Sequence, residues 1–136
     1  MRLKHHHIVA DDIKLHYTDK GNPAGRPIIL LHTLQDCASN WALIVESLSS
    51  DYRTIALDCR GHGESDWVDP SSYRLDNYAS DVESLILNLE LENVVLVGHS
   101  IGTRVAIEYA KRNPSHVSAI IALDYNFSIT SEYELA

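Results

Sequence analysis

Four mainly aliphatic runs are spaced along the chain, at residues 27–31, 54–57, 94–97 and 117–123. Apolar runs of this length predict strands that are buried on both faces, as in a parallel sheet covered by helices. Residues 13–18 instead alternate apolar and polar side chains, which predicts a half-exposed strand. We expect this strand to pair with residues 7–10 as a hairpin that turns at Asp11 and Asp12.

Three helical segments lie between these runs. In the first two, apolar residues recur at helical spacing, and Ser39 and Asp76 are the predicted N-caps. The third helix begins at Ile101 and should end at Asn113, because Pro114 follows. The predicted inward-facing residues are Trp41, Ile44, Val45 and Leu48, then Tyr78, Val82, Leu85, Ile86 and Leu89. This order predicts an α/β fold with a mostly parallel sheet, helices on both faces and an N-terminal antiparallel hairpin.

At 136 residues the chain is long enough for one domain with its own core. Nineteen acidic and 11 basic residues give a net charge of −8. Nucleic acids and anionic membranes both require a basic face, so we expect neither as a partner. No apolar stretch has the length of a signal peptide or a membrane span, and we expect a cytoplasmic chain.

Cysteines and histidines are the remaining candidates for metal or redox chemistry. Cys37 and Cys59 lie in separate segments without metal-type spacing, and we interpret them as a reduced pair rather than a disulfide. Histidines occupy positions 5, 6 and 7, which suggests a metal site or part of a tag. No carboxylate or cysteine cluster accompanies them along the sequence, so we predict no metal ligands.

The run at residues 94–97 ends in G-H-S-I-G at residues 98–102, directly before the third helix. A G-x-S-x-G pentapeptide between a strand and a helix predicts a nucleophile elbow, in which a strained turn lifts Ser100 out of the sheet. The alternative is a serine in an ordinary turn. Active-site residues of such sheets gather beyond the carboxyl ends of the strands. The loops at residues 32–36 and 60–66 should therefore lie near the elbow.

Three loop motifs, each after a predicted strand, carry a resemblance to a known family. They are H-T-L-Q at residues 32–35, R-G-H-G-E-S-D at 60–66 and G-H-S-I-G at 98–102. In this order they resemble the α/β-hydrolases, especially small esterase-like members, over residues 13–124. The resemblance implies that Ser100 is the nucleophile and that backbone N–H groups of Ile101 and Leu34 form the oxyanion hole. It implies a hydrolase that acts on a carboxylic ester or related acyl bond of a small molecule and uses no cofactor. A serine excludes the branches with an aspartate nucleophile, such as the epoxide hydrolases.

The other motif residues are predicted to be structural. His99 should pack in the core on the opposite side of the elbow, while His32 and His62 should shape loops rather than transfer protons. Two positions depart from the family pattern. Thr33 stands where glycine is usual and would restrict the backbone beside the oxyanion loop, and Thr103 replaces the second glycine of G-H-S-x-G-G.

A base for Ser100 is missing from the predicted sheet edge. In this family the triad runs serine, acid, histidine along the chain, and the only histidine after Ser100 is His116. It precedes the strand at residues 117–123, so it should lie at the opposite edge of the sheet, about 17–20 Å away. Asp124 follows that strand and is a candidate acid, although a loop or cap contact is the interpretation we favour.

We therefore expect residues 1–136 to be the amino-terminal half of one hydrolase domain, ending near the start of a cap segment. Such a chain should be inactive alone for lack of the triad histidine, and its last strand should expose an apolar edge open to self-association. Two alternatives stay open. One is a non-catalytic binding or interaction module of the same fold, which Thr33 favours. The other is a half-domain whose histidine comes from a partner chain.

Overall fold

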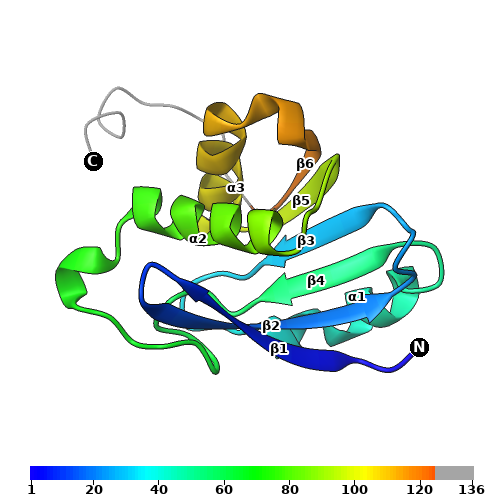
Figure 1. Cartoon of the computed structure of the whole chain (residues 1–136), viewed down its shortest axis with the longest axis horizontal. Coiled ribbons are helices and arrows are strands. Elements are labelled where there is room, and N and C mark those ends of the chain that lie inside the picture. The colour runs from blue at the N-terminus through cyan, green and yellow to red at the C-terminus, as the bar shows by residue number, and fades with distance from the viewer. Residues whose placement is uncertain (125–136) are drawn as a thin grey trace.

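Six strands form one sheet in the order β1-β2-β4-β3-β5-β6 in the computed structural model, which describes residues 1–124 (Figure 1). β1 pairs antiparallel with β2, and β2 with β4, whereas β4, β3, β5 and β6 run parallel to one another. The predicted mostly parallel sheet with an N-terminal hairpin is confirmed. The strands are β1 (Lys4–Ala10), β2 (Ile13–Gly21), β3 (Pro27–Leu31), β4 (Arg53–Leu57), β5 (Val94–His99) and β6 (Val117–Leu123).

The hairpin turns where the sequence predicts. Asp11 and Asp12 have φ angles of 46° and 66°, and Ala10 pairs with Ile13 across them. Two consecutive residues with positive φ are typical of the tight loops whose twist matches that of antiparallel strands.

Helices cover both faces of the sheet, as predicted. Figure 1 shows α2 and α3 on one face and α1 on the other. The larger core lies under α2 and α3, where Tyr78, Val82, Leu85 and Ile86 are buried as expected. A smaller core under α1 includes Trp41. The helices are α1 (Ala42–Leu48), α2 (Leu75–Asn88) and α3 (Ile101–Arg112), with short 3-10 turns η1 (Ala38–Trp41), η2 (Pro70–Ser72) and η3 (Pro114–His116).

The two predicted N-caps are wrong. Ser39 lies inside η1, the 3-10 turn that precedes α1, so it cannot cap the helix. α2 begins one residue after Arg74, and Asp76 lies in its first turn. A carboxylate in that position still interacts favourably with the helix dipole, which explains why the local sequence looks like a cap.

One apolar position also differs from prediction, while the end of the third helix agrees. Ile44 in α1 is 37% exposed instead of facing the core. Leu89, at the C-cap of α2, is half-buried and packs against the larger core, as predicted. α3 ends at Arg112, directly before Asn113 and Pro114, as predicted.

β6 is the outer strand of the described sheet on the side away from the hairpin. Its side chains Ile121 and Leu123 are 49% and 36% exposed, so the predicted apolar edge is present in residues 1–124. Self-association through this edge stays a prediction. Among the helices of the described part of the chain, none combines the length and apolarity needed to span a membrane.

Candidate active site

Ser100 stands alone between β5, which ends at His99, and α3, which begins at Ile101. Its backbone has φ 52° and ψ −112°, a combination that side-chain-bearing residues rarely adopt. Two hydrogen bonds hold it there: the Ser100 N–H donates to the Leu123 carbonyl at 3.1 Å, and the Thr103 N–H donates to the Ser100 carbonyl at 2.9 Å. The predicted strained strand–turn–helix connection is present.

The glycines on either side of Ser100 are required by space. A Cβ on Gly98 would lie 2.3 Å from the Thr103 nitrogen, and a Cβ on Gly102 would lie 2.1 Å from the Leu31 carbonyl oxygen. Both contacts are with backbone atoms, so no side-chain rotation can relieve them. The departure at Thr103 is accommodated, because its buried hydroxyl donates to the Gly98 carbonyl at 2.8 Å. The side chain that replaces glycine therefore ties the helix to the end of β5.

A small cavity of about 10 Å³ lies beside the elbow. The loop after β3 and the start of α3 both line it, so Leu34 and Ile101 lie at the same cavity. α3 directs the positive end of its dipole toward this site. Its lining residues are His32, Thr33, Leu34, Cys59, His62, Tyr78, Ile101 and Val105.

His32 lies in the wall of this cavity but is committed to the backbone. Its Nδ1 donates to the Thr33 carbonyl at 2.7 Å, and its Nε2 accepts the Cys59 N–H at 3.0 Å. Burial lowers the pKa of His32 and keeps the ring neutral. Neither nitrogen is available to Ser100, which agrees with the predicted loop-shaping role. His62 packs on this ring, with centroids 5.1 Å apart, and its Nδ1 lies 2.9 Å from the Arg60 carbonyl.

Arg60 anchors the start of the loop at residues 60–66. Its guanidinium donates two bonds of 2.7 Å to the Asp81 carboxylate on α2 and a third, of 3.1 Å, to the Ser72 carbonyl. Both members of the ion pair are at least 95% buried, and their hydrogen bonds raise the pKa of Arg60. A fork-shaped pair of this kind fixes orientation as well as charge.

Asp58 holds the rest of the same loop and was missed by sequence reasoning. Its buried carboxylate accepts the N–H groups of Ala38 at 2.7 Å and Glu64 at 3.0 Å. A Cβ on Gly63 would lie 2.2 Å from the Asp58 Cγ, so glycine is needed where the loop wraps the carboxylate. The available signal was an aspartate directly after an apolar strand.

His99 differs from its prediction. Its side chain is 36% exposed instead of packed in the core. Its Nε2 lies 3.6 Å from the Asp124 carboxylate, which is 90% exposed. Asp124 thus makes a surface contact at the carboxyl edge of the sheet.

His116 lies where it was expected, far from Ser100. It belongs to η3, which precedes β6, and its Nδ1 lies 3.1 Å from the Tyr109 hydroxyl. β5 and β6 are parallel, with Val94 opposite Val117, so His116 is at the amino edge and Ser100 at the carboxyl edge. The prediction that His116 cannot be the base of Ser100 is supported by this register.

Comparisons with known proteins agree with this architecture. A family model described as the alpha/beta hydrolase fold matches residues 26–135. The chain is 32% identical over 120 residues to 2-(acetamidomethylene)succinate hydrolase from Mesorhizobium japonicum, covering 88% of this chain and 42% of that protein. It is 32% identical over 126 residues to epoxide hydrolase 4 from Mus musculus, covering 90% and 35%.

A solved structure shows the same likeness in three dimensions. An α/β hydrolase from Novosphingobium aromaticivorans has a TM-score of 0.87 to this chain at 25% sequence identity, covering 96% of this chain and 47% of its own. The chain thus spans less than half the length of each of these three proteins. The family match over most of its residues shows that the chain belongs to the α/β-hydrolase fold family.

Proposed function

We propose that Ser100 is the nucleophile of a serine hydrolase that cleaves a carboxylic ester or a related acyl bond. The observation that carries this proposal is the conformation of Ser100, with φ 52° at the exact junction of β5 and α3 and with glycines forced at both flanks. A protein keeps such strain where it serves a function, since an ordinary turn would hold the same strand and helix at lower energy.

The proposed reaction is acyl transfer to the serine oxygen. Ser100 Oγ attacks the acyl carbonyl carbon, and the carbonyl oxygen becomes an oxyanion that accepts N–H bonds from Ile101 and Leu34. Collapse of this intermediate expels the alcohol and leaves an acyl-enzyme on Ser100. Water then repeats the attack and releases the acid. The start of α3 favours the oxyanion because its dipole is positive there.

We infer that neither His116 nor His32 is the base that deprotonates Ser100. His116 is at the wrong edge of the sheet, and both nitrogens of His32 bond to backbone. A serine without a base is a weak nucleophile, and an oxyanion hole with substrate binding leaves a residual catalysis of about 10³–10⁴ over water. We infer that the 136-residue chain hydrolyses esters only slowly by itself.

The names of the relatives support a hydrolase but not one substrate. One is a hydrolase of 2-(acetamidomethylene)succinate and the other an epoxide hydrolase. Branches of the family that open epoxides use an aspartate at the elbow, whereas this chain has Ser100. We therefore favour an acyl substrate over an epoxide.

Chemical rescue tests the proposal on the chain as it stands. Imidazole added to the solution supplies the missing base, and p-nitrophenyl acetate reports on ester cleavage. We expect an imidazole-dependent rate above the rate of imidazole alone, together with a fluorophosphonate adduct on Ser100 detected by intact mass and peptide mapping.

Two variants decide the outcome. Ser100→Ala should remove both the extra rate and the adduct. Ser118→Ala is the matched control, because this hydroxyl lies on β6 at the opposite edge and bonds the Asn93 carbonyl at 2.7 Å; it should keep both. Equal rates for wild type and Ser100→Ala would reject the proposed nucleophile and favour a binding module of the same fold.

A further inference from the structure

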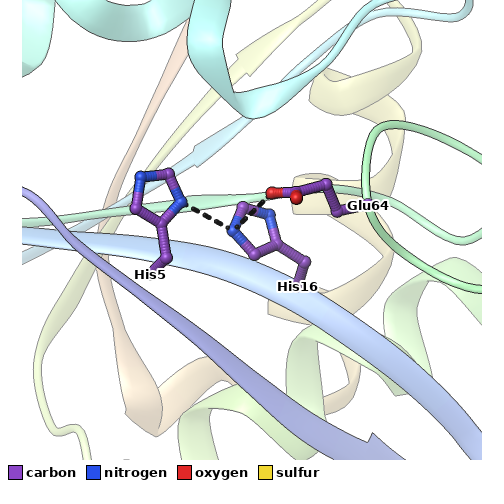
Figure 2. A group of neighbouring side chains, drawn as sticks. All are labelled: His5, His16 and Glu64. Carbon is purple, nitrogen blue, oxygen red and sulfur yellow. Dashed lines mark hydrogen bonds and ion pairs between the residues drawn. The ribbon is translucent and has the colours of Figure 1, made fainter.

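Three side chains of types that commonly bind metal ions come from three separate segments and meet on the face of the sheet that α1 covers. His5 comes from β1, His16 from β2 and Glu64 from the loop after β4 (Figure 2). His5 Nδ1 lies 3.0 Å from His16 Nε2, and Glu64 Oε2 lies 3.1 Å from the same nitrogen. One ligand atom of each residue lies within 4.8 Å of the other two. The fold thus supplies the carboxylate that the sequence does not place beside its histidines.

Asp58 determines which nitrogen of His16 faces this cluster. His16 Nδ1 lies 2.7 Å from the Asp58 Oδ2, and the same carboxylate accepts the N–H groups of Ala38 and Glu64. A carboxylate that accepts this many bonds acts as the acceptor toward His16 as well, so Nδ1 carries the hydrogen and donates it. Nε2 then presents its lone pair to His5 and Glu64. A carboxylate behind a histidine is the partner that usually orients imidazole ligands of metals.

When Nδ1 of His16 carries the hydrogen, Nε2 and its neighbours provide more hydrogen-bond acceptors than donors. The lone pair of Nε2 faces the Glu64 carboxylate oxygen, so one acceptor opposes another at 3.1 Å. His5 Nδ1 can donate one hydrogen bond to His16 Nε2, but this bond leaves the Glu64 carboxylate oxygen without a donor from the cluster. A proton on Nε2 serves one of the two neighbours, whereas a cation accepts electron pairs from all three groups.

We propose that His5, His16 and Glu64 bind a divalent first-row transition metal ion, with Zn²⁺ as the best match. Zn–N and Zn–O bonds of about 2.0–2.2 Å set tetrahedral ligand atoms about 3.3–3.5 Å apart. The observed 3.0 and 3.1 Å are a few tenths shorter, and the exposed side chains of His5 and Glu64 are free to open by that amount. Mg²⁺ and Ca²⁺ fit poorly, since both prefer sites made of oxygen ligands.

The surroundings leave a coordination position open. The cluster lines a cavity of about 380 Å³ between the hairpin, α1 and the loop after β4. Three protein ligands and one open position are typical of zinc sites that exchange water or bind a further ligand. The carboxylates of Asp58 and Glu64 bracket His16, so a dication also offsets two negative charges.

The competing explanation is that the three consecutive histidines chelate the metal as a flexible segment. The alternation of side chains along β1 distinguishes this explanation from a folded site. Side chains alternate along β1, so His5 and His6 point to opposite faces of the hairpin. His6 stacks on Tyr17 with ring centroids 5.2 Å apart, on the core side away from Glu64. A folded site therefore needs His5 but not His6, whereas a flexible tripeptide uses both alike.

The test is a calorimetric titration of the full 136-residue chain with Zn²⁺, with Mg²⁺ as a second titrant. His5→Ala and Glu64→Gln alter exposed ligands and should each weaken Zn²⁺ binding at least tenfold. The matched control His6→Ala should change it less than twofold. Zn²⁺ should also raise the melting temperature of the wild type, because the unfolded chain does not bring His16 and Glu64 to His5.

Each other outcome overturns the site. Equal losses for His5→Ala and His6→Ala would identify chelation by the tripeptide. Zn²⁺ affinity unchanged in Glu64→Gln would remove the carboxylate from the site, and the absence of Zn²⁺ binding by the wild type would remove the site altogether. Equal binding of Mg²⁺ would show that the imidazoles do not contribute.

Discussion

The closeness of α3 to β3 predicts the cost of adding one methyl group at the elbow. In Gly102→Ala the new Cβ would lie 2.1 Å from the Leu31 carbonyl oxygen and 2.8 Å from the Leu31 carbonyl carbon. An ordinary contact is at least 3.4 Å, so helix and strand must separate by about 1 Å. Both partners are backbone, and no side-chain rotation relieves the clash.

Two effects of Gly102→Ala oppose each other. Alanine is a better helix former than glycine by about 1 kcal/mol. Overpacking costs about 1–3 kcal/mol, occasionally more, and a clash with rigid backbone belongs at the upper end of that range or above it. The cost of the clash exceeds the gain in helix propensity, and we expect a net loss of about 2 kcal/mol in the free energy of unfolding.

Urea denaturation followed by circular dichroism measures this loss. With a slope of about 1–3 kcal/mol per M, the midpoint should fall by about 1 M. Arg104→Ala is the matched control, since this exposed residue lies two positions along the same helix and should change stability by less than about 0.5 kcal/mol. A Gly102→Ala variant as stable as the wild type would refute the close approach of α3 to β3.

Three further predictions follow from the conformation and burial of single residues. Ser100→Gly should stabilise the fold by about 1 kcal/mol in the same urea assay, because glycine adopts φ 52° without strain; a destabilised variant would contradict the strain. Burial raises the pKa of Cys59 to about 12, while Cys37 is half-exposed. A thiol reagent at pH 8 should therefore modify one thiol in the native chain and two after denaturation. Burial lowers the pKa of His32, so below about pH 6.5 the unfolded state binds more protons and stability falls as pH falls. Urea midpoints at pH 7.5 and 5.5 should differ less in His32→Gln than in wild type.

Much of the architecture was predictable because the chain encodes it locally. Apolar runs such as residues 27–31 have no polar face to expose, which favours interior strands. The helix end at Pro114 and the turn at Asp11 and Asp12 depend on neighbouring residues alone. The helix starts were harder to predict. Ser39 lies inside the 3-10 turn η1, and nothing in the local sequence distinguishes that turn from the first turn of a helix.

The elbow was predictable for the same reason, whereas the side chains around it were not. Gly98 and Gly102 belong to one pentapeptide, and their positions on either side of Ser100 already imply that the strand and the helix pass close to neighbouring backbone. The environment of His99 depends on its contact with Asp124, which follows a different strand, so the residues of the pentapeptide do not specify it. The cluster around His16 joins residues from three segments, so no local pattern contains it.

One loop connects the two sites, and Asp58 explains why glycine is required within it. The loop must turn tightly enough for the Glu64 N–H to reach the Asp58 carboxylate, which leaves no space for a side chain at Gly63. This turn directs alternate side chains to different regions: His62 lines the cavity beside the elbow, and Glu64 joins the histidines of the hairpin. Ser65 locks the arrangement, since its hydroxyl donates to the Asp58 carbonyl at 2.6 Å and accepts the His16 N–H at 2.8 Å. The loop at residues 60–66 therefore acts through both backbone and side chains: the Glu64 N–H and the Ser65 hydroxyl fix the loop to Asp58, and the Ser65 hydroxyl also fixes it to β2.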